Sequence, residues 1–105
     1  MVIGRGFVKR QALDAAVLDA IGELGPDVIR VFYSVGEDWT GDPSIFFRIV
    51  LSDGSTTDDK LLRTTQRVSS HIEDRLEPME EWGLLPYFDF RSKSEQDELK
   101  AKAWA

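Results

Sequence analysis

The chain has no cysteine and only one histidine, His71, among its 105 residues. The absence of cysteine excludes disulfides, thiolate zinc sites and cysteine nucleophiles together. A single histidine cannot build a histidine-rich metal site. The motifs G-x-S-x-G and H-E-x-x-H and a glycine-rich phosphate loop are missing as well. We therefore expect neither a metal site nor a cofactor.

Long apolar runs are also missing. No stretch approaches the roughly 18 consecutive apolar residues that mark a membrane-spanning helix. The sequence MVIGRGFVKRQ at the N-terminus has no sustained apolar core, so it does not read as a signal peptide. Zero cysteines fit a reducing compartment. These features predict a cytoplasmic protein that does not contact a membrane.

Basic residues are the minority among the charged side chains. Thirteen Lys and Arg against nineteen Asp and Glu give a net charge of −6. An acidic domain does not attract nucleic acid through its overall field, which argues against a general DNA or RNA binder. The same charge suits an inhibitor of a basic, RNA-handling protein, and it equally suits an ordinary soluble protein.

Two apolar runs, Val28–Val35 and Ile45–Leu51, dominate the centre of the chain. Both are rich in β-branched and aromatic residues with a period of two, which predicts strands. A third run, Leu84–Phe90, contains Pro86, which restricts it to a sheet edge or to a strand that starts at Tyr87. The length predicts one domain, residues 1–105.

Helices are expected around these runs. The spacing of apolar residues predicts a helix over about Lys9–Leu24, after a lead-in or short edge strand at residues 1–8. A second helix is predicted from about Asp58 to Glu77, capped at its start by Ser55, Thr56 or Thr57, with its stripe at the residues Leu61, Thr65, Val68, Ile72 and Leu76. One more helical turn is expected at Met79–Trp82.

A last helix is expected near the C-terminus, capped by Ser92 or Ser94. Trp104 is expected to pack on its own domain or on a partner. The fold class that follows is α/β (α+β), with a small mixed or antiparallel sheet covered by helices in the order α-β-β-α-β-α. The segment that joins the first two strands, Gly36–Ser44, is longer than the usual two to five residues of a hairpin loop, and such loops are often functional.

Several charged residues are candidates for chemistry. Basic residues recur at steps of three and four along the second helix, namely Lys60, Arg63, Arg67, His71 and Arg75. This strip either meets phosphates or an acidic partner, or is one side of a solvated mixed-charge helix. If the protein is an enzyme, the candidate magnesium or acid–base carboxylates are Asp42, Asp53 and Asp89. Asp89 lies between Phe88 and Phe90, where it is either outward-facing or functional.

The order of elements resembles the minimal nucleotidyltransferase domains of bacteria. Members of that family have a Gly-Ser pair at the end of a strand, then two aspartates one residue apart at the start of the next strand, and a third aspartate on a later strand. Those carboxylates bind magnesium ions that orient a nucleoside triphosphate. Here Tyr33-Ser34 stands in place of Gly-Ser, and Ile45-Phe46-Phe47 follows Asp42 where the aspartate pair is expected. Asp89 falls near the third position. The resemblance thus implies a nucleotidyltransferase-like fold without the catalytic carboxylate pair.

The phrases GDPSIFFRIVLSD and LLPYFDFRSKSEQ are similar to those of a family of short bacterial proteins. That family is associated with neighbouring genes for HEPN-domain proteins, which are all-helical and often act as RNA-cleaving toxins. Minimal nucleotidyltransferases are common antitoxin partners of HEPN proteins. The resemblance therefore implies a toxin–antitoxin role and a HEPN-domain protein as the partner.

Three functions follow as hypotheses. The first is a non-catalytic binding partner, the antitoxin of a HEPN-type RNase toxin, with contacts from aromatic and arginine residues: Trp39, Phe46, Arg48, Phe88 and Arg91. The second is a divergent magnesium-dependent nucleotidyl or AMP transferase that uses Asp42, Asp53 or Asp89. The third is a single-stranded nucleic-acid module in which Phe32 and Phe46, with Arg30 and Arg48, stack on bases.

Overall fold

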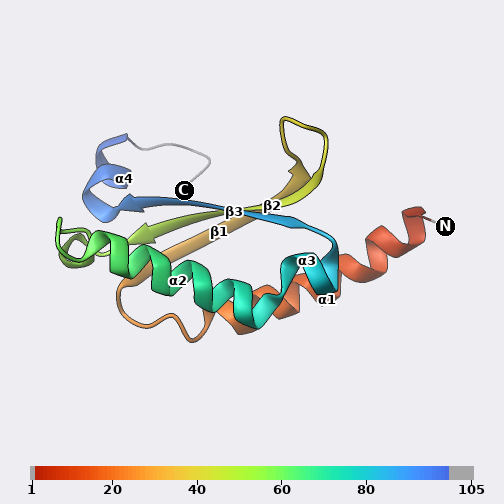
Figure 1. Ribbon diagram of the computed structural model, residues 1–105, viewed down its shortest axis with the longest axis horizontal. Helices are drawn as coiled ribbons and strands as arrows, with labels where there is room; N and C mark the ends of the chain where they lie inside the picture. The colour runs from red at the N-terminus through yellow and green to blue at the C-terminus, as the bar shows by residue number, and fades with distance from the viewer. Residues whose placement is uncertain (1, 100–105) are drawn as a thin grey trace.

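The computed structural model describes the backbone of residues 2–99 and the side chains of residues 10–98 (Figure 1). Trp104, and with it the predicted burial of that side chain, lies outside the described residues. The elements in chain order are α1 (Val2–Ile21), β1 (Val28–Glu37), β2 (Pro43–Leu51), η1 (Asp53–Ser55), α2 (Leu61–Leu76), α3 (Pro78–Trp82), β3 (Leu85–Ser92) and α4 (Lys93–Leu99).

The three strands form one mixed sheet in the order β1-β2-β3. β1 and β2 are antiparallel and form a hairpin, whereas β2 and β3 are parallel. A parallel pair needs a long crossover, which α2 and α3 supply here. The predicted mixed α+β architecture and the order α-β-β-α-β-α are confirmed, and the extra turn expected at Met79–Trp82 is α3.

The helices divide unequally between the two faces of the sheet. α1, α2 and α3 lie on one side, and the short α4 lies on the other (Figure 1). The hairpin end of β1 and β2 rises on the same side as α4. Within residues 2–99, no helix is both long enough and apolar enough to cross a membrane.

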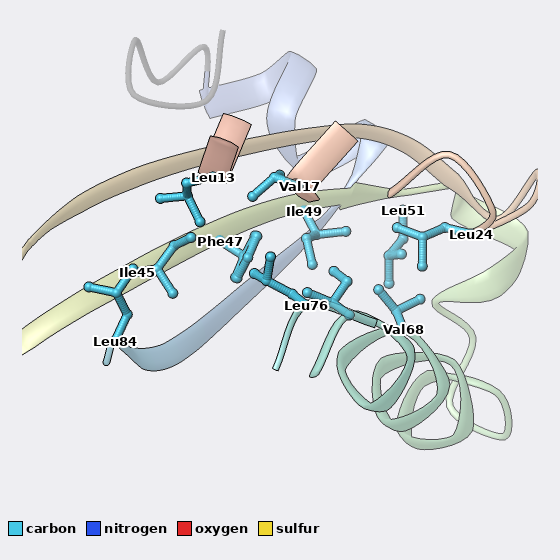
Figure 2. Packing of buried hydrophobic residues seen from close by; sticks show 11 residues of the cluster. Leu13, Val17, Leu24, Ile45, Phe47, Ile49, Leu51, Val68, Leu76 and Leu84 are labelled. Carbon is cyan, nitrogen blue, oxygen red and sulfur yellow. The ribbon is translucent and has the colours of Figure 1, made fainter. Parts of the chain in front are cut away.

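The core fills the space between β2 and the helices α1 and α2 (Figure 2). Alternate residues of β2 project into it, each at most 1% exposed: Ile45, Phe47, Ile49 and Leu51. The helices contribute Leu13 and Val17 from α1 and Val68, Ile72 and Leu76 from α2. Burying one such side chain stabilises the fold by about 1.5–3 kcal/mol, so this layer provides most of the hydrophobic stabilisation.

The first helix differs from its predicted boundaries at both ends. It begins at Val2, so residues 2–8 are helical and do not form a lead-in or an edge strand. It ends at Ile21, before the predicted stop at Gly25-Pro26. Gly22, a poor helix former, follows Ile21 directly, and a turn leads to Gly25 at φ 85°. The glycine inside the apolar pattern was thus the effective end signal.

The joining segment is shorter than predicted. Strand pairing continues through Gly36↔Ser44 to Glu37↔Pro43. β1 therefore ends at Glu37 and β2 begins at Pro43, which leaves only the five residues 38–42 between them. The loop is of ordinary hairpin length. The expectation of a long loop was wrong because both ends of the predicted segment pair as the outer residues of the two strands. Glycine and a proline at the first position of a strand are tolerated there.

The second helix begins later than predicted, at Leu61. None of the predicted caps is used, because Lys60 precedes the helix and no side chain caps it. Instead, the carbonyl oxygen of Thr57 accepts hydrogen bonds from the amides of Lys60 and Leu61, at 2.9 and 2.8 Å. The buried stripe is Thr64, Val68, Ile72 and Leu76. Leu61, predicted to belong to it, is 41% exposed.

The final helix follows the predicted capping box. Ser92 Oγ accepts a hydrogen bond from the Glu95 amide at 3.1 Å, and Glu95 Oε1 accepts one from the Ser92 amide at 3.2 Å. Of the two serines proposed as the cap, the structure therefore selects Ser92. This box fixes the turn from β3 into α4 and so places α4 over one end of the sheet.

Candidate functional site

The face of the sheet turned away from α1 and α2 carries a second set of side chains. Phe46 and Arg48 alternate with the core residues of β2 and therefore project to this side. Register pairs extend the surface to β1 and β3, because directly opposed residues share a face. We call this surface the open face; it consists of Phe32, Ser34, Phe46, Arg48, Tyr87 and Asp89 together with Trp39 from the hairpin loop.

The hairpin loop is held by the carboxylate of Asp38. Its Oδ1 accepts hydrogen bonds from the amides of Thr40 and Asp42, at 2.9 and 3.0 Å, and from the Thr40 hydroxyl at 2.6 Å. Its Oδ2 accepts a hydrogen bond from the Tyr87 hydroxyl at 2.7 Å. Gly41 takes φ 88°, which glycine adopts without strain. The loop is thus tied to itself and to β3.

These bonds also shift two pKa values. The Thr40 hydroxyl, followed by the Tyr87 hydroxyl, stabilises the charged form of Asp38 and lowers its pKa below the usual 3.8. In turn, the bond to Asp38 raises the pKa of Tyr87 above 10.0, because an ionised tyrosine cannot donate it. Both groups therefore keep their hydrogen-bonded form at neutral pH.

Three aromatic rings lie next to one another at the hairpin end of the open face. Tyr87 stacks on Phe46 with ring centroids 5.4 Å apart and an interplanar angle of 15°. The Trp39 ring also contacts Tyr87, with ring centroids 5.4 Å apart and an interplanar angle of 54°. Trp39 nevertheless remains 82% exposed. The ring is therefore positioned by its neighbour but presented almost entirely to solvent.

The arginines of this face are engaged with neighbouring groups. Arg48 donates a hydrogen bond to the Ser34 hydroxyl at 3.3 Å across the β1–β2 pair. Arg30 lies 5.7 Å from the centre of the Phe32 ring, within cation–π distance. At the other end, Arg91 donates to Gln96 of α4 at 3.2 Å. Each of these three arginines therefore has a partner on the sheet or on α4.

The structure brings together three of the five predicted contact residues, Trp39, Phe46 and Arg48. Arg91 lies on the same face but at the end that α4 covers. Phe88 lies on the opposite face, stacked on the core residue Phe47 at 5.2 Å and 10°. It packs against the core and is therefore not part of the open face.

The three candidate carboxylates do not come together. Asp42 precedes β2 and Asp53 follows it, so they lie at opposite ends of a strand roughly 30 Å long at about 3.3 Å per residue. Asp89 is exposed near the middle of β3, opposite Arg48. Within residues 2–99, no group of three or more His, Cys, Asp or Glu side chains is arranged to hold a metal ion.

Asp53 has a structural partner instead. It accepts hydrogen bonds from the amide and the hydroxyl of Ser94, at 3.0 and 2.6 Å, and so joins η1 to α4. These bonds, led by the one from the hydroxyl, lower the pKa of Asp53. The contact spans 41 residues of sequence, so no local pattern indicates it.

Two residues of the site, Tyr87 and Asp38, were not among the predicted contacts. The alternation of β3 was sufficient to find Tyr87: if Asp89 projects outward, Tyr87 does too, and Phe88 projects inward. Asp38 had a weaker signal, since an aspartate two residues before a threonine is a common turn pattern. Its bond to Tyr87 depends on the β2–β3 register, which the sequence does not specify.

The basic strip predicted along α2 is divided between different roles. Arg67 donates to the carbonyl oxygen of Leu24 at 3.0 Å and to Asp27 at 3.1 Å. Arg75 contacts Asp19 and Glu23 of the α1 region, at 2.8 Å each. Arg75 thus links α2 to α1 through Asp19, and Arg67 links α2 to the segment between α1 and β1. His71 is half-buried, and its Nε2 makes no hydrogen bond within the described part of the chain.

Comparison of the chain with protein-family profiles, with curated proteins and with solved structures gave no match.

Proposed function

We propose that this protein is a non-catalytic binding partner that recognises another protein through its open face, with Trp39 as the central anchor. The observation that carries the proposal is the state of Trp39, which is 82% exposed yet seated on a fixed loop. Exposed tryptophans are costly in water, and tryptophan is among the residues that contribute most to binding energy at interfaces. Because the Asp38 bonds already order the loop, little conformational entropy is lost on binding.

The charge around Trp39 favours a basic partner. The hairpin end from Glu37 to Asp42 carries three carboxylates and no cation: Glu37, Asp38 and Asp42. The whole chain, these residues included, carries a net charge of −6. Complementary charge steers association and discriminates between partners. A protein that handles RNA presents a positive surface, so an RNA-cleaving toxin is the kind of partner this surface fits.

We infer further that the partner is a HEPN-type RNase toxin and that this protein is its antitoxin, with a nucleotidyltransferase-like fold. The support is the similarity of GDPSIFFRIVLSD and LLPYFDFRSKSEQ to proteins encoded beside HEPN-domain proteins. The order of elements and the mixed sheet agree with that fold. The separation of Asp42 from Asp53 agrees with a role that does not require catalysis.

The test is co-expression with the product of the neighbouring gene, which the proposal expects to be a HEPN-type toxin. The native chain is expected to relieve growth arrest and to co-purify with the toxin, whereas Trp39→Ala is expected to lose both. Leu18→Ala is the matched control, because Leu18 is 66% exposed but lies on α1, away from the open face. Failure of the native chain to bind or to relieve toxicity would overturn the proposal. Equal loss with Leu18→Ala would overturn the assignment of the surface.

A second candidate function is favoured by one arrangement. Each strand contributes one aromatic residue to the open face, namely Phe32, Phe46 and Tyr87, and arginines lie beside them. Aromatic platforms of this kind stack on the bases of single-stranded nucleic acid. Binding to a single-stranded RNA pool that weakens steeply with salt and is lost in Phe46→Ala would favour this function over the first.

A further inference from the structure

A pocket of about 480 Å³ lies at the start of α2, where the chain brings together η1 and the residue before β1. Its walls are formed by polar and charged residues and one glycine, which are Asp27, Ser52, Gly54, Ser55, Lys60, Arg63, Thr64 and Arg67. Asp27 precedes β1 and Ser52 follows β2, so the pocket is at the opposite end of the hairpin from Trp39. The volume is in the range of small-molecule sites.

The charge of this pocket is opposite to that of the whole protein. Three cations face one carboxylate among its lining residues. Arg67 is bound to Asp27 at 3.1 Å, which leaves Lys60 and Arg63 as the excess charge. Neither Lys60 nor Arg63 has an ion pair in the described part of the chain. Lys60 also interacts electrostatically with Asp59, but Asp59 does not line the pocket, so the lining itself keeps a net positive charge. A positively charged lining in an acidic protein points to an anionic ligand.

The start of α2 adds to this positive potential. The amides of Lys60 and Leu61 bond to Thr57, and the Thr64 amide bonds to Lys60. The amides of Leu62 and Arg63, in the first turn, have no backbone partner within residues 2–99. Unpaired amides and the helix dipole both favour an anion at a helix start. By itself this is a general property of helices, and the next observation is the specific one.

Thr64 provides a polar side chain without a partner. The residue is only 7% exposed and lines the pocket, and its hydroxyl makes no hydrogen bond within the described residues. Its oxygen is also not sealed from solvent, because His71 Nε2 is the only fully enclosed side-chain polar atom without a partner there. Thr64 lines the pocket, which is where the structure leaves room for a partner of this hydroxyl. Buried hydroxyls are normally bonded, so this one is available to a ligand.

The two serines of the pocket support its shape and do not supply donors. Ser52 Oγ donates to Ser55 Oγ at 3.0 Å, and Ser55 Oγ donates to the Ser52 carbonyl at 2.8 Å. The Ser52 amide bonds to the Asp27 carbonyl at 2.8 Å, which joins the two sides of the rim. The groups left to hold a ligand are thus the charges of Lys60 and Arg63 and the hydroxyl of Thr64.

We propose that this pocket binds a small molecule that carries a phosphate group, with Lys60 and Arg63 as its charge partners and the Thr64 hydroxyl as a hydrogen-bond donor. Arginine and lysine with a hydroxyl are the usual set that binds phosphate oxygens. The pocket exceeds the size of one phosphate ion and so has room for the group attached to it. The site is independent of the open face and does not rest on the function proposed above.

The experiment is a titration of the ¹⁵N-labelled full chain with inorganic phosphate and, separately, with ribose 5-phosphate. Saturating shifts are expected at the amides of Gly54, Ser55, Arg63 and Thr64. Ribose 5-phosphate is expected to bind more tightly than inorganic phosphate. Absence of saturable shifts at these amides would overturn the site. Equal affinity for both probes would restrict it to the free ion and overturn the assignment of a larger ligand.

Variants that remove charge distinguish binding by Lys60 and Arg63 from a general attraction of the anion to positive charge on the protein. The double change Lys60→Gln with Arg63→Gln is expected to weaken binding about tenfold or more, since each charged hydrogen bond contributes about that factor. Arg10→Gln with Arg48→Gln removes the same charge from α1 and from the open face, away from the pocket, and is expected to leave the affinity unchanged. Equal weakening in the two double variants would overturn the proposal.

Thr64→Val keeps the shape of the side chain and removes the hydroxyl, so it tests the hydrogen bond alone. Binding of ribose 5-phosphate is expected to weaken about tenfold, and Thr64→Ser is expected to restore most of it. Unchanged affinity in a Thr64→Val protein with a native-like spectrum would remove Thr64 from the site. Together with intact binding in the Lys60 and Arg63 variants, it would leave the pocket without a ligand role.

Discussion

Phe46 and Phe47 are neighbours in β2 but belong to two different environments. Phe47 is 1% exposed and packs between α1, α2 and the rest of the core. Phe46 is half-buried on the open face, where Tyr87 stacks on it. One face of the sheet is therefore filled by helices, and the other is covered only at the α4 end. The comparison indicates that the first face maintains the fold, and that the second is available for recognition.

We expect the largest effect on the free energy of unfolding from a substitution in the core. Phe47→Ala should lower the free energy of unfolding by about 3–5 kcal/mol, because it leaves a cavity in a fully enclosed site. Phe46→Ala should lower it by only about 1 kcal/mol, because the open face has no layer above it. Urea denaturation followed by circular dichroism measures both. Equal losses would mean that the open face is as much a part of the core as the covered face.

The covered face was largely predictable from the sequence. Apolar residues at a period of two in β2 and at helical spacing in α1 and α2 identify Phe47, Val17 and Ile72 without further information. Boundaries were less accurate. Helix α1 ends at Ile21, before Gly22, and does not continue to Leu24, and pairing of Gly36 with Ser44 shortens the loop. Such details depend on strand pairing, which a single sequence does not specify.

The open face was only partly predictable. Trp39, Phe46 and Arg48 follow from residue type and alternation. The contacts that position them, above all Tyr87 with Asp38, span 49 residues and arise only after β2 and β3 pair in parallel. The register in which β2 pairs with β3 is therefore the information that no local pattern of the sequence provides. Phe88 was wrongly grouped with the contact residues for a different reason: its residue type was followed there, although strand alternation places it on the face opposite to Asp89.

The next largest effect concerns the order of the hairpin loop. Asp38→Ala removes the acceptor of four hydrogen bonds, from Thr40 twice, Asp42 and Tyr87. Amide hydrogen exchange at Thr40 and Asp42 should then accelerate about tenfold or more, while core amides stay protected. Asp38→Asn keeps one acceptor oxygen, so it should accelerate hydrogen exchange at these amides less than Asp38→Ala does. Unchanged exchange in Asp38→Ala would show that these bonds do not order the loop.

A smaller effect should appear in the pH dependence of the Asp38–Tyr87 bond. The folded-state pKa of Asp38 lies below 3.8, so its stabilising contribution is complete above pH 3.8 and is lost as pH falls through the folded-state value. The pKa of Tyr87 lies above 10.0, so its contribution is complete below pH 10.0 and is lost as pH rises through the raised value.

The measurement is an NMR titration of the Tyr87 ring, with Tyr33→Phe as the background to remove the other tyrosine. Asp38→Asn should bring the Tyr87 pKa back down towards 10.0, because a neutral amide accepts a weaker hydrogen bond. A Tyr87 pKa that is the same with Asp38 and with Asn at that position would contradict the bond.

The smallest effect on stability is expected at the most exposed residue. Trp39→Ala should change the free energy of unfolding by no more than about 0.5 kcal/mol, because the ring is 82% exposed. Thermal and urea denaturation measure this change in the free energy of unfolding. A loss comparable to that of Phe47→Ala would mean that Trp39 serves the fold, and that its exposure is not a sign of recognition.

The central claim is that the open face, and not the helical face, meets the partner. Its most direct test is an amide spectrum of the ¹⁵N-labelled chain with and without an unlabelled HEPN-type RNase, the partner proposed above. The account predicts that the largest changes fall at Trp39, Thr40, Phe46, Arg48 and Tyr87, with the amides of α1 and α2 little changed. Changes concentrated on α1 and α2, with those five amides unmoved, would contradict it.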